Sequence, residues 1–407
     1  MHSCAESTNV ISSFKKKVLD PGARVNPFVA MAEAGVTPEQ IKAFIVEVLK
    51  PYFSSLERLE DLAVDALAPQ AINLVRLKEN SWALHAFNHV LEIYRHASEL
   101  NPQACYQLCA ESEPAIAESL SEYWSSLYFE EPKDDLDLHD FKYEVFRNIG
   151  ALIEANVQPL LRDVLAQVRI IRGKNPHFDD IKKLKLGNIV DELSRTAGVP
   201  GLFAPPPWGV RLNQWRNIAQ HHRSRVQGKR IIGVFGEPPN ESEVVFSREE
   251  LFSVVICLFS VFQALSIART LFFFDRWENI KPHLRETEVR SDVHMMTFVS
   301  GVSTQGFRVI ELSQNDSSAR ATVLDLHETT QQRLIHASQL LIPLWRSSKA
   351  RLVELRYMTS SKEHKMTFCT TGEACRRLDA EEITIEEYLD HVAFKKVDDG
   401  SPESTSI

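Results

Sequence analysis

The chain has 407 residues and a formal net charge of −9, with 44% hydrophobic and 25% charged residues. These proportions are typical of soluble globular proteins, and the 15 glycines and 19 prolines are too few for a collagen-like or low-complexity chain. At about 100–200 residues per domain, the length predicts two or three domains and excludes a disulfide-stapled miniature scaffold.

The six cysteines show no paired spacing, which a secreted chain of this size would more often have. The first residues, Met-His-Ser-Cys-Ala-Glu, bring a charge before any apolar run, so they lack the architecture of a signal peptide. We therefore expect a cytoplasmic protein.

Residues 1–132 are predicted to form an acidic all-α domain. Thr37, Pro38 and Gln40 supply an N-cap, a proline at the first helical position and a capping-box glutamine, so a helix should begin there. The charged run 130–135 predicts a solvated connector, and a domain boundary fits at this point.

Helical periodicity continues over residues 74–100 and 114–129. Proline cannot continue the helical hydrogen-bond ladder, so interruptions are expected at Asn101-Pro102 and Glu113-Pro114.

Residues 133–281 are predicted to form a second, mainly helical domain with short connections. Helices are expected at residues 141–172, 184–196 and 214–225, and a fourth should begin at the capping box Ser247-Arg248-Glu249-Glu250. A small hairpin is expected within residues 228–240, with 231–235 as one strand.

The last of these helices contains 18 uncharged residues, from Leu251 to Ala268, which is long enough to span a membrane. Its less apolar positions, including Ser253, Ser260 and Gln263, fall on one stripe of a helix. We therefore expect a mostly buried helix of a bundle rather than a membrane span.

Residues 282–397 are predicted to form a smaller α+β domain, and residues 398–407 a disordered tail. The expected strands are at residues 293–299, 307–312, 322–326 and 352–357, and the expected helices are at 329–341 and 384–392.

The segment most suggestive of chemistry is Arg216-Asn217-Ile218-Ala219-Gln220-His221-His222. On a helix, Asn217 and His221 share one face, so the amide could hold the imidazole in one tautomer. The surrounding window, residues 193–236, contains no Asp or Glu but several basic residues: Arg195, Arg211, Arg216, Arg223, Arg225, Lys229 and Arg230. The middle of the chain is also its most basic part, with 19 Lys/Arg against 14 Asp/Glu in residues 141–280. We therefore expect an anionic ligand such as a phosphate here.

These residues resemble the R-N-x-x-x-H signature of HEPN domains, four-helix-bundle modules that include many RNases of toxin, antiphage and RNA-processing systems. The resemblance covers roughly residues 141–276 and includes the order of the helices. It departs from many members at His222, where they carry a small residue, so either imidazole could point into the site. The fold class implied is mainly α, a HEPN-like four-helix bundle preceded by an all-α domain and followed by a smaller α+β domain.

The resemblance implies metal-independent RNA cleavage, with no cofactor. His221 would be the acid/base, Arg216 would hold the phosphate, and Asn217 would orient. The RNA would also meet Arg211, His222, Arg223, Arg225, Lys229 and Arg230. HEPN domains usually pair, so the implied partners are RNA, a second copy of the chain, and a regulatory protein or nucleic-acid trigger, with no membrane.

The alternative is a catalytically inactive HEPN-like module that binds RNA or scaffolds other proteins. Other residue groups carry weaker signals. His85 and His89, like Cys105 and Cys109, have the i, i+4 spacing of metal ligands, but both pairs are interpreted as packing residues. Trp208, after three prolines, is interpreted equally as a base-stacking residue or as a plug for the end of the bundle.

Overall fold

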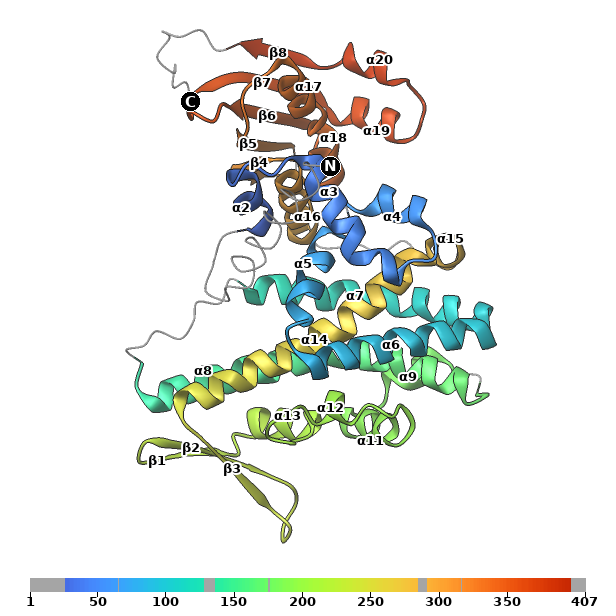
Figure 1. Ribbon diagram of the computed structural model, residues 1–407, viewed down its shortest axis with the longest axis vertical. Coiled ribbons are helices and arrows are strands. Elements are labelled where there is room, and N and C mark those ends of the chain that lie inside the picture. The colour runs from blue at the N-terminus through green and yellow to red at the C-terminus, as the bar shows by residue number, and fades with distance from the viewer. Residues whose placement is uncertain are drawn as a thin grey trace, which may run out of the picture. The chain divides into compact units, whose positions relative to one another are not determined.

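The computed structural model describes residues 26–64, 66–127, 136–174, 176–284, 291–315 and 317–396 (Figure 1). This part of the chain is mainly helical, with a small C-terminal sheet region and a short three-stranded sheet in the middle of the chain. The predicted disordered tail, residues 398–407, and the predicted connector, residues 130–135, lie outside the described residues.

The described residues form two compact units. Unit 1 combines residues up to Lys50, Glu57–Ile72 and the chain from Ser291, and unit 2 combines Pro51–Leu56 with Asn73–Arg290. This division differs from the predicted boundaries at 132 and 281. The helices just before residue 128 pack inside the middle unit because their buried side chains face its long central helix, whereas the first helices pack with the C-terminal part of the chain.

Unit 2 is a helical bundle. Its helical segments are α6 (Ser81–Leu100), α7 (Pro102–Leu127), α8 (Leu138–Ala151), the π-helical η2 (Leu152–Val157), α9 (Gln158–Ile171), α10 (Phe178–Lys182), α11 (Leu186–Thr196), α12 (Pro200–Phe203), α13 (Leu212–Gln220), α14 (Arg248–Asp275), α15 (Trp277–Ile280) and η3 (Lys281–His283). Three helical segments cross the division between the units: η1 (Lys50–Tyr52), α4 (Leu56–Leu62), of which Leu56 alone belongs to unit 2, and α5 (Ala68–Leu77).

The predicted hairpin is a three-stranded antiparallel sheet in unit 2, ordered β1 (Ser224–Gln227), β2 (Arg230–Phe235) and β3 (Ser242–Phe246). It follows α13 directly and leads into α14 (Figure 1). The sheet therefore connects the helix that carries the candidate motif to the long helix α14.

The central helix α14 begins as predicted, at a capping box in which Ser247 Oγ accepts from the Glu250 N–H at 3.2 Å. It is the one helix of the described residues with the length and composition of a membrane span, yet 56% of its most apolar window is buried inside the protein. It packs on α6 and α8, so the prediction of a buried bundle helix is confirmed. Of the predicted polar stripe, Ser253 is exposed and Ser260 is half-buried, while Gln263 is buried and donates to Asn73 Oδ1 at 3.4 Å.

Two helix boundaries differ from the predictions. Helix α7 continues through Pro114 instead of stopping there, although an internal proline costs about 3 kcal/mol. Burial offsets this cost, since Cys109 before the proline and Ser119 after it are both buried, and Ser119 Oγ donates to the Asn156 carbonyl at 3.2 Å. The long helix predicted at 141–172 is present as α8, η2 and α9 in succession, with a π-helical segment at its centre.

Unit 1 contains the C-terminal sheet and its helices. The helices are α2 (Pro27–Glu33), α3 (Pro38–Leu49), α4 (Leu56–Leu62), α16 (Ser291–Thr304), α17 (Gln331–Gln339), α18 (Leu341–Ser348), α19 (Gly372–Asp379) and α20 (Ile385–Leu389). The sheet runs in the order β4 (Phe307–Gln314), β5 (Ser318–Asp325), β6 (Leu352–Met358), β7 (His364–Thr371) and β8 (Ala393–Lys396). Only the β5–β6 pair of this sheet is parallel, and helices α17 and α18 connect its two strands.

The predicted capping box at Thr37 is confirmed at the start of α3. The predicted strand at 293–299 is wrong, since these residues lie in α16, whose Phe298 and Val302 are four residues apart and both enter the core of unit 1. Strand β7 escaped prediction because its sequence, His-Lys-Met-Thr-Phe-Cys-Thr-Thr, carries few of the long apolar side chains that mark a buried strand.

Candidate functional site

The candidate motif lies in the second half of α13 and in the turn that ends it. Leu212, Trp215 and Ile218 bury one face of this helix in unit 2. The helix stops at Gln220, five residues earlier than predicted. His221 caps it, His222 has a φ of +51°, and the Arg223 N–H donates to the Ile218 carbonyl at 3.1 Å. This is a Schellman-type ending in which His222 takes the position usually held by glycine.

Arg216 is anchored by a carboxylate of the π-helical segment. Its Nε donates to Glu154 Oε1 at 2.6 Å, and its Nη2 lies 2.6 Å from the same oxygen. Gln220, one turn further along α13, donates from Nε2 to Glu154 Oε2 at 2.7 Å. Glu154 therefore fixes the orientation of the guanidinium while its own second oxygen is held by the amide.

Asn217 and His221 are joined through the main chain. The His221 N–H donates to the Asn217 carbonyl at 3.0 Å, and the His221 side chain is exposed to solvent. The predicted bond from the Asn217 amide to the His221 imidazole is not among the hydrogen bonds that these two described residues form. The cause is the early end of the helix, which turns the chain at His221 rather than continuing the helical face.

The window that contains no Asp or Glu in the sequence is surrounded by carboxylates from other elements in the folded protein. Each remaining predicted RNA-binding arginine pairs with a carboxylate from another element: Arg211 with Asp191 at 2.6 Å, Arg223 with Glu241, Arg225 with Glu243 at 2.7 Å, and Arg230 with Glu250 at 3.2 Å. Lys229 lies exposed in the turn between β1 and β2. Exposed pairs of this kind contribute only about 0–1 kcal/mol, so a phosphate can displace the carboxylates at small cost.

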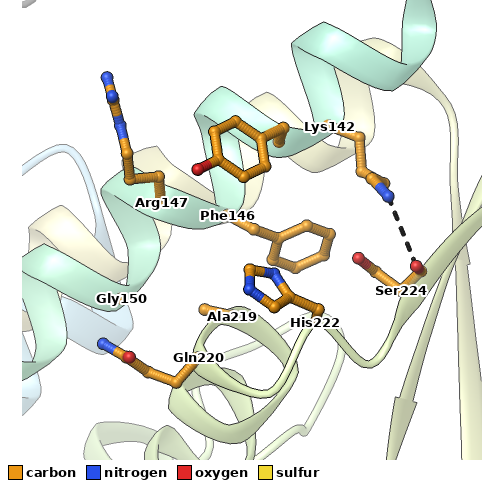
Figure 2. Close-up of a pocket in the computed structure, with 9 residues that line it drawn as sticks. Lys142, Phe146, Arg147, Gly150, Ala219, Gln220, His222 and Ser224 are labelled. Carbon is orange, nitrogen blue, oxygen red and sulfur yellow. Dashed lines mark hydrogen bonds between the residues drawn. The ribbon is translucent and has the colours of Figure 1, made fainter.

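A pocket of about 170 Å³ adjoins the motif. Figure 2 shows that α8 supplies Lys142, Phe146, Arg147 and Gly150 to it, while the end of α13 and the start of β1 supply Ala219, Gln220, His222 and Ser224. Tyr143 completes the lining. Of the two neighbouring histidines, His222 therefore lines the pocket, and His221 lies at the helix end beside it.

Sequence reasoning missed the contribution of α8. Lys142, Phe146 and Gly150 recur every four residues, so they form one stripe of that helix. A Cβ at Gly150 would lie 3.4 Å from the Ala219 Cβ, which is ordinary van der Waals contact, so α8 and α13 pack closely at this point. The sequence did contain a signal for this side of the pocket. It is the succession of a basic residue, an aromatic residue and a glycine on one stripe of a helix.

The weaker candidates behave as packing residues. Trp208 is half-buried and meets the rings of Trp215 and Phe246 edge-on, with centroids 6.3 and 6.1 Å away. His89 Nε2 lies 2.5 Å from the Ala197 carbonyl oxygen, and Cys105 and Cys109 are buried free thiols.

Unit 1 holds a separate polar cluster around the buried Asp325. Arg333 donates to Asp325 from Nε and Nη2, at 3.2 and 2.8 Å to Oδ1, and stacks on the Phe307 ring at 3.8 Å. His336 lies between Arg333, at 3.3 Å from Nδ1, and Gln305, at 2.6 Å from Nε2. Burial, followed by the Arg333 charge, lowers the pKa of His336 below its ordinary value.

The described residues contain no group of three or more His, Cys, Asp or Glu side chains arranged to hold a metal ion. Comparison with known proteins finds no matching family model, no matching curated protein and no matching solved structure. The functional argument therefore depends on the α13 motif and the groups around it.

Proposed function

We propose that the protein is a metal-independent endoribonuclease of HEPN type that acts in the cytoplasm, as part of a toxin or antiphage system. The observation that carries the proposal is the Arg216–Glu154–Gln220 arrangement next to the exposed His221. It holds a guanidinium in one orientation, five residues before an imidazole that solvent and substrate can reach.

Arg216 would hold the scissile phosphate. Both contacts with Glu154 use the Nε–Nη2 side of the guanidinium, so the Nη1 end meets no partner among the described residues. That end can donate charge-assisted hydrogen bonds to phosphate oxygens, and these strengthen as negative charge grows in the transition state.

His221 would move the protons. As a base, it takes the proton of a ribose 2′-OH while the 2′-oxygen attacks phosphorus. As an acid, it gives a proton to the 5′-oxygen as the P–O5′ bond breaks. The products are a 2′,3′-cyclic phosphate and a 5′-hydroxyl, and the reaction uses no oxidant or metal.

One α13 supplies one arginine and one acid/base, whereas the reaction needs a base and an acid on opposite sides of the phosphate. We therefore propose that two copies of the chain bring their α13 helices together around a twofold axis. A regulatory protein or nucleic-acid trigger would then control access to that shared site.

The test is incubation of single-stranded RNA with the full chain in EDTA, followed by analysis of the product ends. The expected result is cleavage with 2′,3′-cyclic or 2′/3′-phosphate ends. Cleavage that EDTA abolishes would contradict the mechanism. The matched control is Arg346→Ala, which removes an exposed arginine of unit 1 that pairs with Asp379 and leaves Arg216 in place.

The alternative function is an inactive RNA-binding or protein-interaction scaffold. It is favoured by the same ion pair, because an arginine already held by Glu154 also serves simply to join α13 to η2. RNA that binds but stays intact at every condition tested, with and without added metal, would support this alternative.

A further inference from the structure

We propose that the pocket between α8 and the end of α13 binds one base of single-stranded RNA, with Tyr143 and His222 as the stacking surfaces and Lys142 and Arg147 on the flanking phosphates. The identification of RNA as the ligand rests on the function proposed above. Of the R-N-x-x-x-H motif, only the variable positions Ala219 and Gln220 line the pocket, and three of the four residues named here come from α8.

The aromatic groups suit a base. The rings of Tyr143 and His222 are tilted by only 14° and their centroids lie 6.4 Å apart, so they present nearly parallel faces. Tyr143 is 53% exposed, which is unusual for a ring of this size. Exposed aromatic side chains on which bases stack, next to cationic groups, are the general device for binding single-stranded nucleic acid.

The conformation of His222 supports a binding role. A left-handed φ of +51° costs an ordinary L-residue about 1–2 kcal/mol, and glycine would avoid that cost. The chain instead keeps an imidazole at this position, and the turn directs it into the pocket, as Figure 2 shows. Non-glycine residues in such conformations concentrate at functional sites.

The charges of the lining suit a phosphate backbone. The lining includes two cations and no carboxylate. Lys142 Nζ is held by the Ser224 carbonyl at 3.4 Å, and Arg147 pairs with Glu144 across a surface contact of 2.5 Å. Both partners are weak competitors for a phosphate, since a backbone carbonyl is neutral and exposed ion pairs contribute about 0–1 kcal/mol.

The size of the pocket limits what it can hold. Its volume of about 170 Å³ is smaller than the roughly 300–1,000 Å³ of ordinary small-molecule sites, so it admits a single ring system rather than a whole cofactor. It is also adjacent to the proposed chemistry. Gln220 lines the pocket and holds Glu154, which holds Arg216. A base in the pocket would therefore lie next to the nucleotide whose phosphate Arg216 holds.

The test is the affinity of the full chain for a short, fluorescently labelled, 2′-O-methyl RNA, measured by fluorescence anisotropy. This probe lacks the 2′-OH, so binding is measured without cleavage. Tyr143→Ala should weaken binding by about 5- to 100-fold, the effect of losing one stacked base. Tyr143→Phe keeps the ring and should bind within about twofold of wild type. Phe394→Ala, which removes an exposed ring from unit 1, is the matched control and should have no effect.

Cleavage of unmodified RNA separates this proposal from the nuclease proposal. Tyr143→Ala should keep the single-turnover rate at saturating RNA, whereas His221→Ala should lose that rate and keep the affinity. Loss of affinity in Tyr143→Ala in a protein that never cleaves RNA would support the pocket and contradict the nuclease. Equal affinity of wild type, Tyr143→Ala and a Lys142→Gln variant would overturn the pocket, and so would failure of the wild type to bind the probe.

Discussion

At the scale of single residues, the adjacent His221 and His222 have different surroundings although they are neighbours in the sequence. His221 caps α13 and faces solvent, while His222 enters the pocket beside Tyr143. The sequence predicted that the Asn217 amide would hold the His221 imidazole, whereas in the structure the two residues are joined through the main chain. It could not predict which imidazole enters a pocket, because that depends on the residue at which α13 ends.

The first prediction concerns the proposed acid/base and clamp. His221→Ala should lower the single-turnover cleavage rate by about 10²–10⁴-fold, the usual worth of general acid–base catalysis. Arg216→Ala should lower it by about 10²–10³-fold, because a preorganised donor to the transition state is lost. His222→Ala should weaken RNA binding but leave the rate at saturating RNA nearly unchanged. An inactive His222→Ala together with a normally active His221→Ala would reverse the assignment.

A second prediction isolates Glu154. Glu154→Gln keeps an oxygen that can accept from Arg216 but removes the negative charge beside it. The pair is about one-third exposed, so the free energy of unfolding should change by no more than about 1 kcal/mol. RNA should bind more tightly, since a phosphate no longer competes with a carboxylate. Weaker binding, with the melting temperature unchanged, would contradict this prediction, because it would mean that the charge of Glu154 helps RNA binding more than it competes with the phosphate.

At the scale of elements, the ends of helices decided which sequence predictions succeeded. The starts of α3 and α14 were predictable because capping boxes act within four residues. The end of α13 was not, because the segment contains no glycine at the position that takes a positive φ. The interruption predicted at Pro114 failed for a related reason. The packing that keeps α7 helical across this proline involves residues distant in the chain.

The third prediction tests the end of α13. His222→Gly should be more stable than His222→Ala by about 1 kcal/mol, because only glycine adopts the left-handed conformation without a steric penalty. Both variants lack the ring, so both should bind RNA more weakly than wild type. Chemical denaturation of the two variants, followed by circular dichroism, measures the difference. Equal stabilities would mean that His222 does not hold a positive φ in solution.

At the scale of the whole molecule, the helical class and the C-terminal sheet were predictable from periodicity, but the division into units was not. A change in composition along the chain predicts a polar connector, but it does not tell which helices pack into the same core. The charged run near residue 132 lies between α7 and α8, and both of these helices belong to unit 2. The ion pairs of the basic window, residues 193–236, were not predictable for a similar reason. Their carboxylates lie outside the window in the sequence and come close only in the folded chain.

The fourth prediction concerns the dependence of unit 1 on pH. The pKa of His336 is lowered in the folded protein by burial and by Arg333, despite the opposing charges of Asp325 and Glu39. The unfolded chain therefore binds a proton more readily, so stability is complete above the ordinary pKa of about 6.5 and falls as the pH drops below it. The protection factors of amides in β5 and β6, which are the exchange rates corrected for the fall of the intrinsic rate with pH, should decrease between about pH 7 and pH 5.5. His336→Gln should flatten this dependence, and an unchanged profile would contradict it.

The fifth prediction concerns the assembly proposed for the active site. Each Arg216→Ala or His221→Ala homodimer lacks one required group in both halves. Mixed dimers can combine an intact arginine from one copy with an intact histidine from the other. Mixing the two variants should therefore restore part of the cleavage rate. A protein that stays monomeric and still cleaves RNA would rule out a shared site.

Unit 1 is built from separate parts of the chain, and this affects the order in which the units can fold during synthesis. Its first helices, α2 and α3, pack on α16 and β4, and Asn26 Nδ2 donates to Ser303 Oγ at 3.0 Å. Roughly 220 residues of chain lie between Ile72 and Ser291, and a ribosome adds them in about 10–45 s at ~5–20 residues per second. Throughout that interval the N-terminal helices expose the apolar side chains of Phe28, Val29 and Ile41 with no core to receive them. During synthesis, unit 2 can therefore complete its core before unit 1 does.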